Sequence, residues 1–143
     1  MTRAAWMRLG LAVLVVQSAV IGVWAGFAPR SFYDDFPGFG RHWVSVDGPY
    51  NEHLVRDVGW LNLALTVVTV WAMVTLARSL VLATLVGWLV ADVPHLVYHA
   101  AHLDVLSTGD GTVEIVSLAL APAIAAALLV LVARSPAATG VTA

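Results

Sequence analysis

One segment of the sequence, between positions 88 and 102, has the residue types and the spacing of a polar site on one side of a helix. It contains Trp88, Asp92, His95, His99 and His102. At about 100° per residue, these side chains fall within roughly a quarter of the helix circumference, and apolar residues occupy another side. Two histidines at positions i and i+4 beside a carboxylate are typical of metal ligands and of proton-transferring groups. The pattern predicts that this helix carries the functional site.

A matching polar group opens the apolar segment that precedes this helix. The group consists of Glu52, His53, Arg56 and Asp57, and the last three have the spacing of one helical side. Because only positions 78 and 79 separate the two apolar segments, we expect antiparallel neighbours whose polar faces meet at one end. We therefore predict a metal site between them. Its predicted ligands are His95, His99, His102, His53 and Asp57, with Asp92, Arg56 and Glu52 as supporting polar residues.

Imidazole and carboxylate ligands suit a transition metal such as zinc, iron or copper. The chain contains no cysteine, so thiolate ligands and disulfides are excluded. Haem ranks below a single metal ion, because no second histidine stands well inside another apolar segment. The residues do not specify a reaction, and they do not decide whether the protein is an enzyme.

Two alternatives to metal binding stay open. The ladder from Asp92 to His102 could be a proton or ion path, since aspartate and histidine act as relays in transporters. Such a path needs an exit, and only Trp88 and Thr84 continue it toward the other end of the helix. In the second alternative the protein is a non-enzymatic scaffold, and the polar stripe packs helices together or docks a partner.

Four apolar segments must position these residues. Of the 143 residues, 60% are hydrophobic and only 11% are charged, far fewer than in a soluble domain. A membrane-spanning helix needs about 20 apolar residues. The sequence therefore predicts an all-α bundle of four transmembrane helices in a single domain, with one ordered external loop between the first two. The predicted spans are 9–28, 58–77, 80–103 and 113–132, and the predicted loop is 29–57.

The arginines predict the orientation of the bundle. All seven basic residues are arginine, and they fall in two sets: Arg3, Arg8, Arg78 and Arg134 on one side, and Arg30, Arg41 and Arg56 on the other. Cytoplasmic loops carry the excess of positive charge, so both termini are placed in the cytoplasm. The first apolar segment is too long for a cleaved signal peptide, which predicts an uncleaved anchor. The arginine-only, Ala-, Val- and Leu-rich composition indicates the plasma membrane of a GC-rich bacterium.

The composition also limits the partners. A net charge of -2 without any basic run excludes nucleic-acid binding, so the lipid bilayer is the expected environment. The loop 29–57 is rich in aromatic residues, which we interpret as a belt at the level of the lipid headgroups rather than as a ligand pocket.

The stretch from Asn51 to Leu63 resembles the opening of the second span in small four-helix bacterial membrane proteins of the DoxX-like kind. Some DoxX-type proteins are linked to membrane redox complexes and quinone reduction. The resemblance therefore implies an accessory subunit of a membrane redox or transport complex. Separately, His95, His99 and His102 resemble one histidine box of membrane di-iron desaturases and hydroxylases. Those enzymes use several such boxes, whereas this chain has five histidines in all, so a stand-alone di-iron oxygenase is not implied.

Overall fold

The computed structural model describes residues 2–134 and confirms an all-α, four-helix membrane protein. Four helices are long and apolar enough to cross a membrane: α1 (Arg3–Phe27), α3 (Glu52–Thr75), α4 (Arg78–Ala100) and α5 (Thr108–Ala133). α4 and α5 each continue through an internal proline. The helices therefore match the predicted spans in number and order, although each begins earlier than predicted.

Capping side chains explain three of the four early helix starts, those of α1, α3 and α5. Thr2, Asn51 and Ser107 each accept a hydrogen bond from the backbone N–H three residues further on, at 3.1 to 3.2 Å. Such caps satisfy N–H groups that have no partner within the helix. Hydropathy locates the membrane-embedded part, whereas the caps decide where the helix begins. Residues 52–57, predicted as the end of the external loop, are consequently the first turns of α3.

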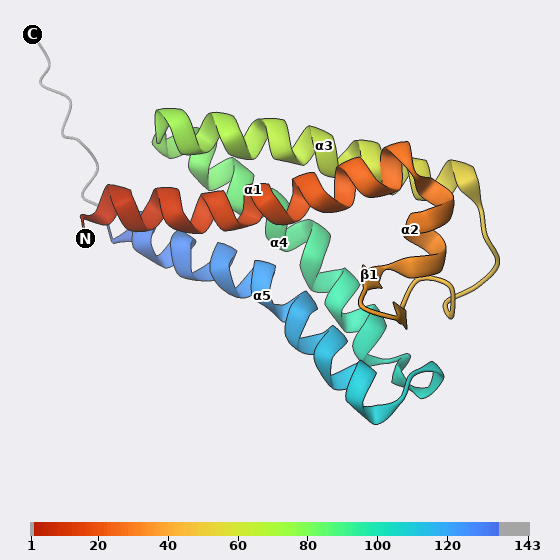
Figure 1. Cartoon of the computed structure of the whole chain (residues 1–143). Helices are drawn as coiled ribbons and strands as arrows, with labels where there is room; N and C mark the ends of the chain where they lie inside the picture. Colours follow the sequence, from red (N-terminus) through yellow and green to blue (C-terminus); the bar gives the residue numbers. More distant parts are fainter. Residues whose placement is uncertain (1, 135–143) are drawn as a thin grey trace, which may run out of the picture.

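The four spans form two closely packed pairs. α1 packs along α3 and α4 packs along α5, with far fewer contacts between the pairs. The pairs converge at the end that holds the start of α1, the end of α5 and the α3–α4 connection, and they diverge toward the other end (Figure 1). The short α3–α4 connection therefore makes these helices antiparallel without keeping them together along their length.

An apolar core fills the converging end. Its buried members come from all four spans: Met7, Leu11, Leu14, Ala72, Val81, Leu85, Trp88, Ala121, Ala125, Leu128 and Val132. Trp88 lies at the edge of this core that faces the diverging end. Its indole N–H donates a hydrogen bond to the Thr69 hydroxyl at 3.0 Å. The core thus ends near the middle of the bundle, and the polar side chains of α4 begin one helical turn closer to the diverging end.

The segment between α1 and α3 occupies the diverging end. It contains α2 (Pro29–Asp35) and a small antiparallel hairpin of β1 (Pro37–Gly38) and β2 (Arg41–His42). Phe32 and Trp43 are buried, at 5% and 6% exposed. The interpretation as a headgroup belt is therefore wrong for these two aromatic residues, because Phe32 packs inward against Ala25 of α1 and Val55 of α3, and Trp43 packs against Phe36.

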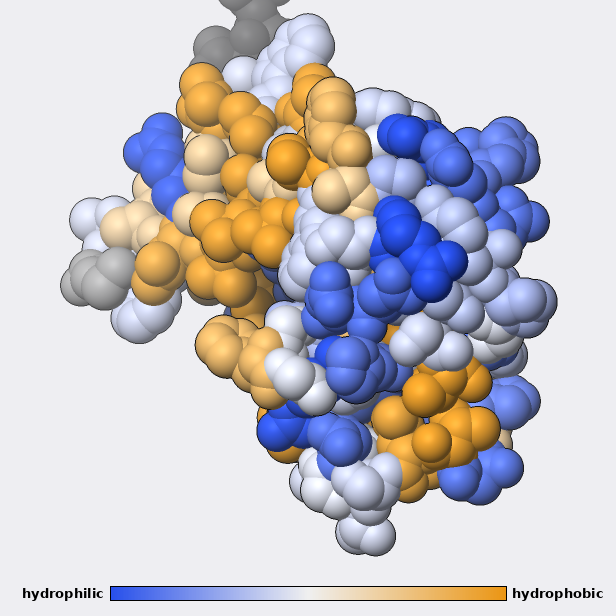
Figure 2. Space-filling model, turned by 45° about the vertical axis from the view of Figure 1, so that its right-hand side comes forward, coloured by the Kyte–Doolittle hydropathy of each residue, from blue (hydrophilic) through white to orange (hydrophobic). Residues whose placement is uncertain are grey.

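An ion pair between Arg41 and Asp110 fastens the hairpin to the first turn of α5. Hydrophilic residues gather on the end of the molecule that comes forward in Figure 2, whereas hydrophobic residues cover much of the flank that leads away from it. This distribution is the one expected for a bundle whose flank faces lipid and whose end faces water.

The contact between α1 and α3 depends on two glycines, and this generates a stability prediction. A Cβ atom at Gly59 would overlap the backbone N and Cα of Gly26. Small residues of this kind let membrane helices approach closely. We expect Gly59→Ala to lower the free energy of unfolding by about 1–3 kcal/mol, the range for overpacking. The measurement is reversible unfolding of the purified protein in mixed micelles.

Gly87→Ala is the matched control, because nothing lies within 4 Å of a Cβ atom added at that helical position. It should leave stability unchanged or raise it by about 0.5–1 kcal/mol, since alanine favours a helix interior. Equal effects of the two substitutions would contradict the packing argument.

The orientation and the bacterial plasma-membrane location stay predictions. Because the chain has no cysteine, single substitutions provide background-free labels. Val46→Cys places a thiol in the loop, and Ser79→Cys places one at the opposite end of the bundle. With cytoplasmic termini, a membrane-impermeant maleimide should label Val46→Cys in intact cells and Ser79→Cys only after permeabilisation. The reverse pattern would invert the orientation.

Candidate functional site

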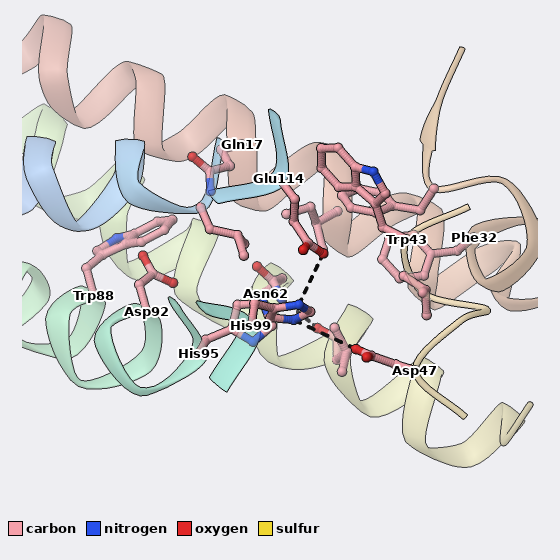
Figure 3. Close-up of a pocket in the computed structure, with 15 residues that line it drawn as sticks. Gln17, Phe32, Trp43, Asp47, Asn62, Trp88, Asp92, His95, His99 and Glu114 are labelled. Atoms are coloured by element: carbon pink, nitrogen blue, oxygen red, sulfur yellow. Dashed lines mark hydrogen bonds and ion pairs between the residues drawn. The ribbon is translucent and has the colours of Figure 1, made fainter. Parts of the chain in front are cut away.

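A cavity of about 260 Å³ lies where the helix pairs diverge, between the spans and beneath the loop (Figure 3). We call it the polar pocket. The side chains that line it come from all four spans and the loop: Gln17, Ile21, Phe32, Phe36, Trp43, Val44, Asp47, Val58, Asn62, Trp88, Asp92, His95, His99, Glu114 and Leu118. Its polar groups therefore belong to elements that are distant in the sequence.

His99 is the centre of the polar contacts. Its Nδ1 lies 3.1 Å from Oε1 of Glu114 in α5, and its Nε2 lies 4.0 Å from Oδ2 of Asp47 in the loop. Figure 3 shows the ring between these two carboxylates. The contact with Glu114 has the length of a hydrogen bond, whereas the one with Asp47 is a longer electrostatic contact. His99 thereby links α4, α5 and the loop.

His95 and Asp92 extend this group toward the apolar core. The His95 ring meets the His99 ring edge to face, with centroids 4.6 Å apart. Asp92 is one helical turn closer to the apolar core, and its Oδ2 is buried without a hydrogen-bond partner. Together with Trp88, these three side chains all line the polar pocket. The helical face inferred from their spacing is thus the face that lines the cavity.

The polar pocket carries more acidic than basic groups. Its three carboxylates, on Asp47, Asp92 and Glu114, face two histidines and no arginine. Elsewhere in residues 2–134, arginines pair with acidic residues outside the pocket: Asp34, Glu52 and Asp110. Glu114 is only 3% exposed. Glu114 is paired with His99, and the Asp47 side chain is 30% exposed, whereas Asp92 Oδ2 is buried without a partner. Since a charge removed from water is costly unless it is paired, a proton or a cation would stabilise the Asp92 end of the pocket.

The predicted residues on α3 lie outside the polar pocket. His53 is 88% exposed at its side chain and pairs with Asp57, at 3.3 Å between Nε2 and Oδ2. Arg56 donates to Glu52 at 2.9 Å and to the carbonyl of Gly26 at 2.6 Å. The expected meeting of this face with α4 does not occur, because α3 packs on α1 and diverges from α4.

His102 also lies apart from the other histidines of the stripe. α4 ends at Ala100, so His102 no longer follows the helical spacing. Its ring stacks on Tyr98 at 4.2 Å, and its Nδ1 contacts the Tyr98 carbonyl oxygen at 2.7 Å. Both of these contacts hold the His102 side chain against Tyr98, at the surface of the turn that follows α4.

The two acidic pocket residues outside α4 were missed in the sequence. Glu114 is the only acidic residue within the predicted span 113–132, and an ionisable residue inside a span signals a functional site by default. That signal was present and would have found it. Asp47 lies in a loop with several other acidic residues, so nothing in the sequence distinguishes it.

The metal site in its predicted form is not assembled. Across residues 2–134, no three His, Asp or Glu side chains lie in an arrangement that could hold a metal ion. His95 and His99 are the two predicted ligands that the fold brings together, and Glu114 and Asp47 join them in place of the predicted partners.

The fold and the polar pocket define a class: an integral membrane four-helix protein with an acidic cavity open between two helix pairs. No family model matches the chain, and searches of curated proteins and of solved structures found no match. The resemblance to DoxX-like proteins, and the membrane-complex partners that it implies, therefore stay predictions.

The unpartnered carboxylate of Asp92 generates a prediction about stability. Asp92→Asn keeps the size of the side chain and removes its charge. We expect the free energy of unfolding to rise by roughly 1–2 kcal/mol, because the wild-type charge lies in a poorly hydrated place without a partner. The measurement is chemical unfolding in micelles at neutral pH.

Asp57→Asn is the control for this prediction, since Asp57 is half exposed and its ion pair is with His53, one turn away on the same helix. Its effect should stay within about 0.5 kcal/mol, as for other surface ion pairs. A loss of stability in Asp92→Asn would show that the carboxylate has a stabilising partner instead.

Proposed function

We propose that this membrane protein binds a small cation in the polar pocket. The observation that carries the proposal is the excess of carboxylates around the cavity, with no arginine to balance them. A protonated His99 would balance one of the three carboxylates. The remaining charge makes the cavity a favourable place for a positively charged ligand.

The walls of the polar pocket support the same ligand class. Phe32, Phe36, Trp43 and Trp88 line it beside the carboxylates. Aromatic faces attract cations, and the attraction grows when water is displaced. Carboxylates with aromatic walls suit an organic ammonium ion. Carboxylates with imidazoles are also the ligand types of a divalent metal ion, although no three of these side chains converge on one point within residues 2–134. The organic ammonium ion and the metal ion share the property that the pocket would recognise, which is positive charge.

Binding agrees better with the structure than conduction does. Below Asp92, the indole of Trp88 and the apolar core that includes Leu11 and Leu85 fill the space between the helices. A proton or ion path would need titratable or hydrated groups there. Among residues 2–134, the stripe has no ionisable side chain beyond Asp92, and the buried hydroxyls of Thr69 and Thr84 are already bonded to the Trp88 indole and to the Leu80 carbonyl. The cavity therefore has the form of a binding site with access from one half of the membrane.

The test is a binding measurement on the detergent-purified chain with zinc and with methylammonium as separate probes. A bound cation should raise the unfolding midpoint, because binding to the folded state adds about 1.4 kcal/mol for each tenfold of ligand above its dissociation constant. We expect Glu114→Gln to weaken binding of the active probe by tenfold or more. Glu52→Gln, which removes an exposed carboxylate outside the pocket, should leave it unchanged.

A His95→Ala, His99→Ala double variant separates the two sources. Loss of stoichiometric metal in this variant, measured by elemental analysis, would assign the site to a metal ion. Methylammonium binding that survives the double variant would assign it to an organic cation. If neither probe shifts the midpoint of the wild type, the proposal is wrong and the non-enzymatic scaffold stands in its place.

A further inference from the structure

A second cavity, of about 750 Å³, runs along the outside of the bundle between α1 and α5. We call it the lateral groove. It is lined by Ala12, Val13, Val16, Gln17, Val20, Ile21, Phe36, Pro37, Phe39, Arg41, Trp43, Val113, Ser117, Leu118 and Leu120. Nearly all of these side chains are apolar, and those on α1 stand in the middle of a membrane span. The lateral groove therefore opens toward the lipid chains.

The lateral groove and the polar pocket share part of their walls. Gln17, Ile21, Phe36, Trp43 and Leu118 line both. The two spaces are thus separated by single side chains, with acidic groups on one side and an apolar channel on the other. A molecule that passed between these shared side chains would meet carboxylates at one end and hydrocarbon at the other.

The geometry points to a membrane-soluble amine as the ligand: an ammonium head in the polar pocket and one hydrocarbon chain in the lateral groove. This inference rests on the proposed function and takes its organic form. The head is specified by the unbalanced carboxylates, and the chain by the continuous apolar wall. From Ala12 to Ile21 the groove follows about 13 Å of helix, the length of a medium alkyl chain.

The hairpin of β1 and β2 borders the lateral groove at the diverging end of the bundle. Phe39 at the hairpin tip is fully exposed, which places an aromatic ring where the groove meets the membrane interface. Arg41 is held by its ion pair with Asp110 and is not free to neutralise the pocket. The lateral groove therefore offers lipid-dissolved amines a route that does not cross the hydrophilic end of the molecule.

The experiment compares decylammonium and methylammonium binding to the full chain in nanodiscs of fixed lipid composition. Val16→Trp fills the lateral groove, and Val67→Trp is the matched control on a lipid-facing part of α3, since the two valines are 62% and 65% exposed. We expect Val16→Trp to weaken decylammonium binding at least fivefold and to leave methylammonium binding unchanged. Val67→Trp should change neither. Partition into the lipid is the same in all samples, so it cancels in the ratios.

The outcomes separate this inference from the proposed function. Binding of zinc or methylammonium, with decylammonium unaffected by Val16→Trp, would overturn the inference and leave the cation site intact. Binding of neither ammonium ion would overturn the inference, whatever the result with zinc. A phospholipid that copurifies with the wild type and is lost in Val16→Trp, without a change in decylammonium binding, would assign the groove to an ordinary lipid chain and overturn the inference as well.

Discussion

The two helix pairs pack together from one end of the bundle to about its middle, and the structure at the other end follows from how their divergence is filled. In a membrane, an open gap between helices would admit lipid chains and leave the polar side chains that face it without partners. Here the chain between α1 and α3 folds back into the gap, and Phe32 and Trp43 supply its apolar filling. Where the filling ends, His99, Glu114 and Asp47 join three separate elements through one network. The polar pocket is the space that this arrangement encloses.

Much of the fold could be predicted from the sequence, because the four apolar segments are long and the number of spans follows from bilayer thickness. The helix starts could not be read from hydropathy, since Thr2, Asn51 and Ser107 set them by capping polar turns that lie outside the apolar segments. The two-residue separation between the second and third segments correctly indicated antiparallel helices. It carried no information about their divergence, which depends on which faces pack better elsewhere.

The candidate site was predictable on one helix and not between helices. Asp92, His95 and His99 share a face by helical periodicity alone, and that face lines the cavity. The partners across the cavity depend on tertiary packing. The close approach of Gly26 and Gly59 commits α3 to α1, and this turns His53 and Asp57 away from α4. Glu114 then takes the place that these residues were expected to fill.

The converging end of the bundle also has a mechanical consequence. Helices of 23 to 26 residues are about 35–39 Å long, and their apolar core lies toward one end. The core is therefore a pivot about which the two helix pairs can rotate relative to each other. A rotation of about 5° about the core moves helix ends that lie about 20 Å away by about 2 Å, comparable to the helix shifts seen in switching proteins. Small repacking among leucines and alanines at one membrane face is thereby amplified into a change of width at the other.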